Sequence, residues 1–191
     1  MKNLKLWFCL LCVLGFPKMS AFAQQSTSKQ LFLDEGDKVE MYPKVDWLKG
    51  EPITHFDKHK IYIVELWATW CVPCLLAMPH ISDLNHKFKD KNVVFIAQDI
   101  MEEDKAKVET LVQQRSSVFN FPVAYGGGAQ SDFSVKWVAA AGIRSIPQTL
   151  VIQNNTLVWI TRPNMLNEQI IQLLIDGKFS VEAAEKLVKK D

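Results

Sequence analysis

The chain has 191 residues, of which 48% are apolar and 23% charged, and its formal charge at pH 7 is +1. This composition is that of an ordinary globular protein with enough residues for one compact domain, and it excludes disordered and collagen-like classes. A charge so close to zero, with no basic stripe along the sequence, gives no electrostatic footprint for nucleic acid, so no nucleic-acid partner is expected.

The first 23 residues have the pattern of a secretory signal peptide. Two lysines precede an apolar run from Leu6 to Phe16, and Ala21-Phe22-Ala23 is a small-x-small cleavage pattern. An uncleaved membrane anchor is the alternative, but this apolar run is much shorter than the roughly 20 residues that span a bilayer. Cleavage predicts an exported, periplasmic protein with a polar, flexible leader over 24–35 and one domain over 36–191.

Export also changes the cysteine inventory. Cys9 and Cys12 would leave with the signal peptide, so the mature chain would keep one closely spaced pair, Cys71 and Cys74. Exported proteins of small size commonly carry a dispersed disulfide framework, which this chain lacks. A loop as short as this one constrains the unfolded chain little, so stabilisation is a poor reason for the pair.

Strands and helices are expected to alternate along most of the chain. Residues 36–60 hold short apolar islands broken by prolines and a glycine, which predict short strands and turns. Ile61 to Trp67 is nearly continuously apolar, which is typical of a central strand covered on both faces. The elements expected after it are a helix over 71–89, a strand over 93–97, a helix over 103–114, a strand over 121–125, a short helix over 132–140, a hairpin of strands over 146–152 and 156–161, and helices over 165–175 and 181–189. This order predicts an α/β fold with a central mixed sheet flanked by helices, parallel through the early crossovers and antiparallel at the closing strands.

The cysteine pair stands where the first long strand meets the first helix. Open α/β folds place their sites at this carboxyl edge of the sheet. The unpaired amides and the macrodipole of a helix N-terminus favour an anion, so the Cys71 thiol should ionise readily and attack. Cys74 can then reach back and resolve a mixed disulfide formed at Cys71, and Pro73 stiffens the pair at little cost to the first turn. A metal site or an inert pair is the alternative.

The segment Trp67-Ala68-Thr69-Trp70-Cys71-Val72-Pro73-Cys74 resembles the active site of thioredoxins. It is similar in particular to that of the exported TlpA/ResA-type thiol-disulfide oxidoreductases. The resemblance implies a thioredoxin-like fold with a redox-active disulfide, and it extends over about residues 36–176. Within that range it implies an N-terminal hairpin over 36–60 and a central strand-helix insertion over 118–140.

A second segment carries the same resemblance. Residues 142–150, Gly-Ile-Arg-Ser-Ile-Pro-Gln-Thr-Leu, resemble the loop in which a cis-proline faces the dithiol. The resemblance implies a cis bond between Ile146 and Pro147, places Pro147 in the catalytic site, and implies that Ile146 offers backbone groups to a bound substrate. The other expected substrate contacts, all beside the reactive cysteine, are Trp70, Val72 and Pro73.

Glu65 is a lone carboxylate inside a strand that is expected to be buried on both faces, where acids are rare without a purpose. Side chains alternate along a strand, so Ile63, Glu65 and Trp67 share one face. If the helix bearing Cys74 covers that face, Glu65 lies beneath the dithiol. The resemblance favours a catalytic role, because Glu65 takes the place of the buried acid that shuttles protons in thioredoxins. The alternative is a structural acid at the margin of the sheet or paired with a lysine.

No metal ion or cofactor is expected. His80 and His86 lie on the helix that follows the cysteines, but their spacing fits no usual zinc pattern. His55 and His59 flank a loop. All four histidines are therefore interpreted as surface residues.

The sequence predicts an exported thiol-disulfide oxidoreductase that reduces disulfides in other exported proteins through Cys71 and Cys74. Its partners would be exported proteins with disulfides or thiols, and a membrane electron donor is compatible with this role. The same motif serves proteins with reduction potentials from about −270 to about −120 mV, so Val72 and Pro73 do not decide the direction. A Cu(I)-binding metallochaperone that uses the same dithiol is the second hypothesis, because two thiolates suit Cu(I). Against it, no methionine or histidine is near enough in sequence to complete a site.

Overall fold

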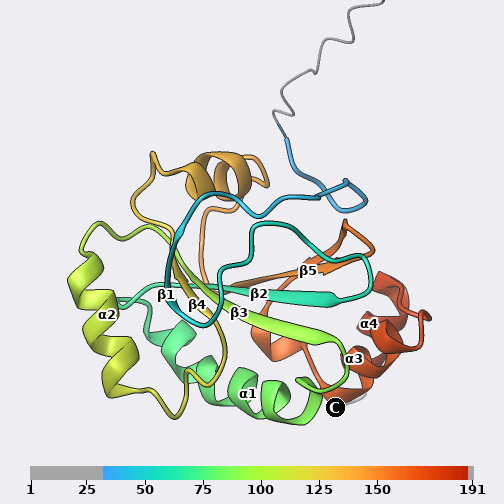
Figure 1. Ribbon diagram of the computed structural model, residues 1–191. Helices are drawn as coiled ribbons and strands as arrows, with labels where there is room; N and C mark the ends of the chain where they lie inside the picture. The colour runs from blue at the N-terminus through green and yellow to red at the C-terminus, as the bar shows by residue number, and fades with distance from the viewer. Residues whose placement is uncertain (1–31, 189–191) are drawn as a thin grey trace, which may run out of the picture.

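Six strands form one mixed sheet at the centre of the molecule, in the order β1-β4-β3-β2-β5-β6 (Figure 1). The computed structural model describes residues 32–188, and the expected signal peptide, residues 1–23, lies outside the described residues. The strands are β1 (Asp46–Lys49), β2 (Ile61–Trp67), β3 (Val93–Asp99), β4 (Val123–Tyr125), β5 (Gln148–Gln153) and β6 (Thr156–Thr161). The helical elements are α1 (Val72–Phe88), α2 (Lys105–Gln114), the π-helical turn η1 (Ser134–Ala139), the 3-10 turn η2 (Pro163–Met165), α3 (Glu168–Ile175) and α4 (Val181–Val188).

Strand β2 lies in the middle of the sheet, and all seven of its residues are buried. It pairs in parallel with β3 and antiparallel with β5, while β3 continues in parallel to β4 and β5 continues antiparallel to β6. A strand covered on both faces needs apolar side chains in both directions, which explains its nearly unbroken apolar sequence. The pairing confirms the expected α/β fold, parallel through the early crossovers and antiparallel at the closing strands.

The turn between β5 and β6 closes the sheet on one side. Asn154 and Asn155 have φ values of 52° and 55°, in the left-handed region. A tight hairpin turn requires this conformation, and asparagine tolerates it better than most residues with a side chain. The expected hairpin is therefore confirmed, with the two asparagines at its tip.

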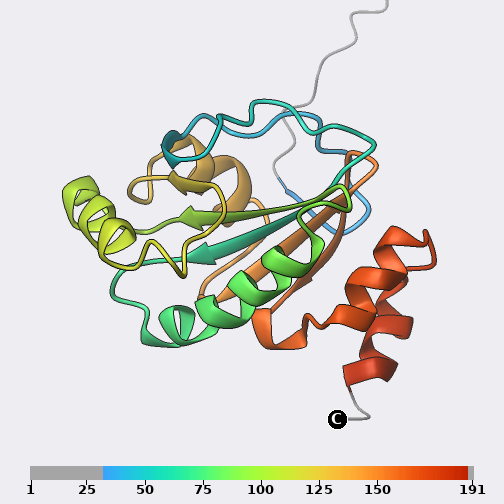
Figure 2. The ribbon, with the colours of Figure 1, turned by 60° about the horizontal axis from the view of Figure 1, so that its bottom comes forward.

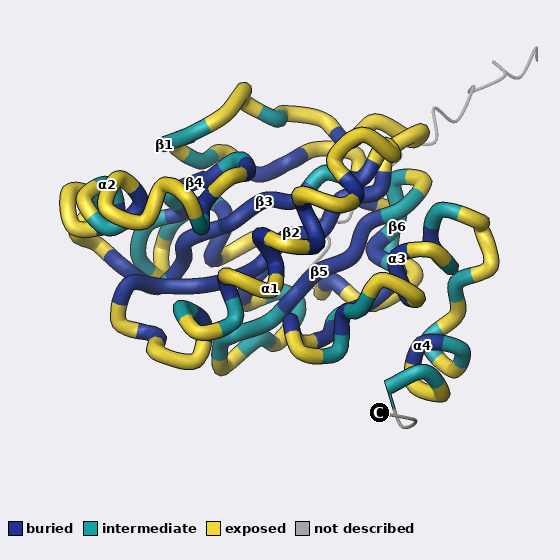
Figure 3. Tube along the Cα trace, turned by 90° about the horizontal axis from the view of Figure 1, so that it is seen from below, coloured by how far each residue is buried: buried dark blue, intermediate teal, exposed yellow. Residues whose placement is uncertain are grey.

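The two faces of the sheet are covered by different parts of the chain (Figure 2). Helices α1 to α4 contribute to one core with Ile63 and Trp67 of β2, and the other face packs against η1 and the segment before β2. Figure 3 shows that β2 is buried along its length, and in β3 every residue except Val94 is buried. Because Glu65 shares the face of Ile63 and Trp67, α1 covers the face that carries Glu65.

The segment before β2 contains a short antiparallel pairing within the range of the expected N-terminal hairpin, in which the Tyr42 amide donates to the Thr54 carbonyl oxygen and the Phe56 amide to the Glu40 carbonyl oxygen, each at 2.9 Å. Met41 and His55 form an isolated antiparallel bridge, while β1 pairs antiparallel with β4 at the edge of the sheet. That edge belongs to the central insertion, a partner far away in sequence, so local patterns could not indicate it. Leu33, expected in the leader over 24–35, is 4% exposed and its amide donates to the Ala140 carbonyl oxygen at 3.0 Å. The folded part therefore includes residues before 36.

Other boundaries shift by a few residues. β3 continues beyond the expected range to Asp99, which stays in register with Trp67 of β2 and Tyr125 of β4. The central insertion consists of β4 and η1, the latter a π-helical turn within the range 132–140 where a short helix was expected. No helix within residues 32–188 has both the length and the apolar character needed to cross a membrane.

Candidate active site

Cys71 and Cys74 are joined by a disulfide at the N-terminus of α1. Their sulfur atoms are 2.04 Å apart, and Cys71 is the N-cap residue, whose Sγ accepts a hydrogen bond from the Cys74 amide at 3.3 Å. Amide donation and the helix dipole both favour a thiolate at the position of the Cys71 sulfur when the pair is reduced. The Sγ of Cys74 lies farther inside, 4.0 Å from the Leu66 carbonyl oxygen of β2.

The exposed fractions of the two cysteines differ in the expected direction. Cys71 is 4% exposed and Cys74 is 0% exposed. Cys71 is therefore the more accessible of the two cysteines. The division of labour between an attacking Cys71 and a resolving Cys74 stays a prediction, and this order of burial agrees with it.

Exposed apolar side chains lie beside the disulfide. Trp70 is 53% and Val72 63% exposed on either side of Cys71, and Leu76, one turn along α1 from Val72, is 75% exposed. Residues four apart on a helix share a face, so Val72 and Leu76 extend one apolar strip from the disulfide. Leu76 was not among the expected substrate contacts. The signal for it is a leucine on the face of α1 opposite the buried Cys74 and Met78.

The loop before β5 brings the expected proline to the same edge of the sheet. The peptide bond between Ile146 and Pro147 is cis, as the resemblance implied. Gln148, the next residue, pairs with Leu66 in β2, so Pro147 lies level with the end of β2, from which the chain continues to Cys71. Ile146 is half-buried and packs against the core cluster that contains both cysteines.

Glu65 lies fully buried on the central strand, on the face covered by α1. Its Oε2 accepts a hydrogen bond from the hydroxyl of Thr149, which lies directly opposite Glu65 on β5. Its Oε1 has no hydrogen-bond partner within the described part of the chain. Burial raises the pKa of Glu65 well above its usual value, and the bond from Thr149 opposes this shift in part. Glu65 therefore lies in the middle of the sheet and not at its margin, and among residues 32–188 no lysine forms an ion pair with it.

A second acidic group, which the sequence analysis missed, adjoins the turn before Cys71. Glu102 follows β3 and is 6% exposed; it accepts the Thr69 amide at 2.9 Å and the Thr69 hydroxyl at 2.5 Å, and Lys107 lies 3.1 Å from its Oε1. Asp99, the last residue of β3, is fully buried, and neither of its carboxylate oxygens has a hydrogen-bond partner among residues 32–188.

Asp99 has an unusual protonation equilibrium. Burial, with a smaller contribution from the charge of Glu102 and against the opposing charge of Lys107, raises its pKa to about 8. Asp99 was not recognised from the sequence because the expected strand ended at residue 97, and an acidic residue outside a buried strand is not unusual. The available signal was its position at the carboxyl edge of the strand next to β2, where sites of open α/β folds gather.

The histidines do not take part in the site. All four are exposed, as expected, and the ring of His80 contacts the Leu166 carbonyl oxygen at 2.8 Å. Within the part of the chain that the structure describes, no group of three or more His, Cys, Asp or Glu side chains is placed to hold a metal ion.

Comparison with known proteins agrees with this geometry. The family described as Redoxin matches residues 50–172. The chain is 31% identical over 129 residues to the thiol-disulfide oxidoreductase ResA of Bacillus cereus, covering 67% of this chain and 69% of that protein. It is 24% identical over 149 residues to the protein FixW of Rhizobium leguminosarum, covering 76% of this chain and 67% of that protein.

A solved structure shows the same fold. The putative thiol:disulfide interchange protein DsbE from Chlorobium tepidum superposes with a TM-score of 0.56 at 18% identity, covering 82% of this chain and 98% of that one. This level of identity supports the thioredoxin-like fold, while the match to ResA and the family model carry the assignment. The chain therefore belongs to the Redoxin family, as a thiol-disulfide oxidoreductase of the TlpA/ResA type with a thioredoxin-like fold.

Proposed function

We propose that this protein is exported and reduces disulfides in other exported proteins through Cys71 and Cys74. The observation that carries the proposal is the setting of Cys71, which caps α1, is bonded to Cys74 and lies between the exposed side chains of Trp70 and Val72. The reducing direction rests on the resemblance to TlpA/ResA-type proteins, and export rests on the pattern of residues 1–23.

The first step is attack by Cys71. In the reduced protein its thiolate attacks one sulfur of the substrate disulfide, a mixed disulfide forms, and the other substrate sulfur leaves as a thiolate. The N-cap position stabilises the attacking thiolate through the amide of Cys74. Trp70, Val72 and Pro73 would contact the substrate protein around the disulfide, and Ile146 would offer backbone groups to it beside Pro147.

The second step is resolution by Cys74. Its thiol must lose a proton before it attacks the Cys71 sulfur, after which the second substrate thiolate leaves and the disulfide between Cys71 and Cys74 remains. Glu65 is the proposed acceptor of that proton, because it is buried on the face that α1 covers and Cys74 lies against the carbonyl of the next residue, Leu66. A raised pKa suits a carboxylate that takes a proton near neutral pH.

Electrons must then return to the disulfide between Cys71 and Cys74. A membrane protein with a dithiol is the donor that an exported reductase requires, because the oxidising compartment supplies no dithiol pool. Substrate proteins would be exported chains whose disulfides are accessible to an apolar surface such as the one formed by Trp70, Val72 and Leu76.

The test of direction is the reduction potential of the Cys71/Cys74 pair, measured against glutathione buffers. A potential near the roughly −270 mV of thioredoxin supports a reductant, whereas a value near about −120 mV would identify an oxidant. Turnover of a protein disulfide such as insulin, with Cys71→Ser as the inactive control, establishes the activity itself. Stoichiometric Cu(I) binding under anaerobic conditions without disulfide turnover would instead favour the metallochaperone.

The test of export is the N-terminus of the protein isolated from its native cells. Mass spectrometry of the periplasmic fraction should find a chain that begins at Gln24. A full-length chain that stays with the membrane fraction would show that residues 1–23 act as an uncleaved anchor.

A further inference from the structure

The carboxylate of Glu102 joins the loop between β3 and α2 to the turn that precedes Cys71. Its two oxygens accept the amide and the hydroxyl of one residue, Thr69, at 2.9 and 2.5 Å. Glu102 is 6% and Thr69 8% exposed, so both bonds are shielded from water, where charge-assisted hydrogen bonds are strong. Thr69 cannot rotate out of this position without leaving a buried carboxylate short of two donors.

Further bonds attach the residues around Thr69 to the same loop. The Ile100 amide donates to the Trp67 carbonyl oxygen at 2.9 Å, and the indole N–H of Trp70 donates to the Met101 carbonyl oxygen at 3.4 Å. Within the turn, the Cys71 amide donates a hydrogen bond to the Ala68 carbonyl oxygen at 3.1 Å. The place of Cys71 at the start of α1 therefore depends on residues 100–102.

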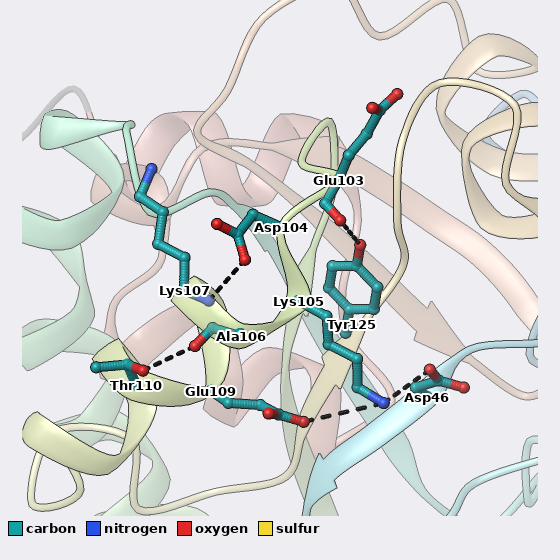
Figure 4. Close-up of polar contacts among 9 residues, drawn as sticks. All are labelled: Asp46, Glu103, Asp104, Lys105, Ala106, Lys107, Glu109, Thr110 and Tyr125. Carbon is teal, nitrogen blue, oxygen red and sulfur yellow. Dashed lines mark hydrogen bonds and ion pairs between the residues drawn. The ribbon is translucent and has the colours of Figure 1, made fainter.

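Further polar contacts hold this loop and the start of α2 (Figure 4). The hydroxyl of Tyr125 donates to the Glu103 carbonyl oxygen at 2.9 Å, and the side chain of Asp104 caps α2 by accepting the Lys107 amide at 3.1 Å. Lys105 forms an ion pair with Asp46 of β1 at 2.9 Å. Bonds to β4 and α2 fix the loop, and the ion pair to β1 holds the first residue of α2, so the loop can serve as a support for the turn.

We propose that Glu102 is a positioning residue for the dithiol, whose bonds to the Thr69 amide and hydroxyl hold the turn that presents Cys71 to a substrate disulfide. This role rests on the proposed attack by Cys71. Glu102 acts through Thr69 and takes no part in bond exchange. A disulfide substrate must align three sulfur atoms with the attacking thiolate at one end, so a small rotation of the turn slows the reaction with a bulky protein partner.

Asp99 makes this support sensitive to pH. It interacts electrostatically with Glu102, and it is fully buried with no hydrogen-bond partner for its carboxylate among the described residues. The charged and titratable groups that interact with it are Glu102 in the loop, Lys107 on α2 and Tyr125 on β4. The carboxylate of Glu102 faces Lys107, whose Nζ lies 3.1 Å from its Oε1. Once Asp99 ionises, two neighbouring carboxylates repel each other, and the bonds from Glu102 to Thr69 weaken.

The direct test follows the backbone amide of Thr69 by NMR in the oxidised protein, where neither cysteine titrates. Because burial raises the pKa of Asp99 to about 8, the chemical shift of this amide should change around that pH in the wild type. It should stay constant from pH 6 to 10 in Asp99→Asn. A flat profile in the wild type, or the same inflection in Asp99→Asn, would overturn the link between Asp99 and the turn.

The functional test compares two disulfide substrates in a set of matched variants. Thr69→Val removes the hydroxyl with little change of shape, and Thr69→Ser restores it. Thr69→Val should lower the second-order rate constant for a protein disulfide about tenfold, while the rate of alkylation by iodoacetamide changes less than about threefold. Thr69→Ser should recover most of the loss. Equal losses with both reagents would show an effect on the thiolate itself and would overturn the positioning role.

A double-mutant cycle tests whether Thr69 acts through Glu102. Thr69→Val combined with Glu102→Gln should be about as slow as the slower single variant, because both changes break one connection. Losses that multiply would show two independent effects and contradict the proposal. Insulin turnover by the wild type is the separate check on the proposed function. If the wild type does not turn over insulin, the proposed function is wrong. The pH profile of the Thr69 amide tests the contact between Glu102 and Thr69 whether or not the protein is active.

Discussion

The two faces of the sheet use buried side chains in opposite ways. On the face away from α1, four aromatic rings pack together with centroid separations of 5.4–5.9 Å, from the residues Tyr42, Phe56, Phe133 and Trp137. The one hydroxyl in that group, of Tyr42, donates to Gln98 at 2.8 Å. On the face under α1, Glu65 and Asp99 leave three carboxylate oxygens without a hydrogen-bond partner in residues 32–188.

This difference indicates that the aromatic face contributes mainly to stability, whereas the face under α1 contributes mainly to the chemistry of the site. Aromatic packing with satisfied polar groups stabilises the fold, whereas a buried acid without full partners destabilises it. Buried acids with perturbed pKa values often cluster at functional sites, and Glu65 and Asp99 lie on the sheet face whose core contains both cysteines. Substitutions on the two faces should therefore have opposite signatures: loss of stability with normal rates on the aromatic face, and loss of rate with equal or greater stability under α1.

The largest expected effect concerns the cysteines themselves. Cys71→Ser should reduce disulfide turnover to the background rate, because the attacking thiolate is gone. Cys74→Ser should keep the attack but trap substrates as mixed disulfides through Cys71, which non-reducing gels and mass spectrometry would detect. If Cys71→Ser traps partners and Cys74→Ser does not, the roles of the two residues are reversed.

Removing an aromatic ring from the opposite face should lower stability most. Phe133 is fully buried and contacts the rings of Tyr42 and Trp137. Phe133→Ala should reduce the free energy of unfolding by about 3–5 kcal/mol, through lost transfer free energy and the cavity left behind. Phe133→Leu is the matched control and should lose much less.

Urea unfolding measures that loss, and turnover per folded molecule should stay at the wild-type value. A fall in turnover at full folding would show that the aromatic face communicates with the dithiol, and the separation of the two faces would be wrong.

Glu65→Gln should show the opposite signature. The rate at which Cys74 resolves a mixed disulfide should fall roughly 10- to 100-fold, because its thiol loses the proton acceptor. Stability at neutral pH should hold or rise, because a buried acid with a raised pKa has been removed. Stopped-flow turnover and urea unfolding, compared between the two proteins, measure both effects. Unchanged turnover with lower stability would make Glu65 a structural residue.

The pH dependence of stability should reveal Asp99. Its pKa is raised from 3.8 to about 8, so between these pH values the folded protein holds a proton that the unfolded chain has released. The free energy of unfolding should therefore fall as pH rises from about 4 to about 8 and then level off, with a slope of at most about 1.4 kcal/mol per pH unit from this group.

Asp99→Asn should flatten this part of the profile and stabilise the protein at pH 7. Asp83→Asn, an exposed acid on α1, is the matched control and should leave the profile unchanged. Equal profiles for the wild type and Asp99→Asn would mean that Asp99 is ionised in the folded protein near neutral pH.

Much of the site was predictable from sequence because its signals are local. The Cys71/Cys74 pair, the apolar strand before it and the helix after it are contiguous, and strand alternation placed Glu65 on one face with Trp67. Thr149, whose hydroxyl donates a hydrogen bond to Glu65, lies 84 residues away in the sequence, and only the pairing of β2 with β5 brings the two together. The sheet position of β1 could not be predicted for a related reason, since β1 finds its partner in β4.

The sequence by itself determined where the chemistry of this protein lies: two cysteines at a helix start, after a strand that must be buried, indicate thiol-disulfide exchange, with Cu(I) binding by the same dithiol as the second hypothesis. Only the tertiary structure decided which groups adjust that chemistry. Glu102 accepts hydrogen bonds from Thr69, which lies 33 residues earlier in the sequence. Asp99 becomes a buried acid because β3 places it beside Trp67, where no donor among the described residues forms a hydrogen bond with its carboxylate. Burial and charge interactions depend on what the fold brings together, and no local pattern records them.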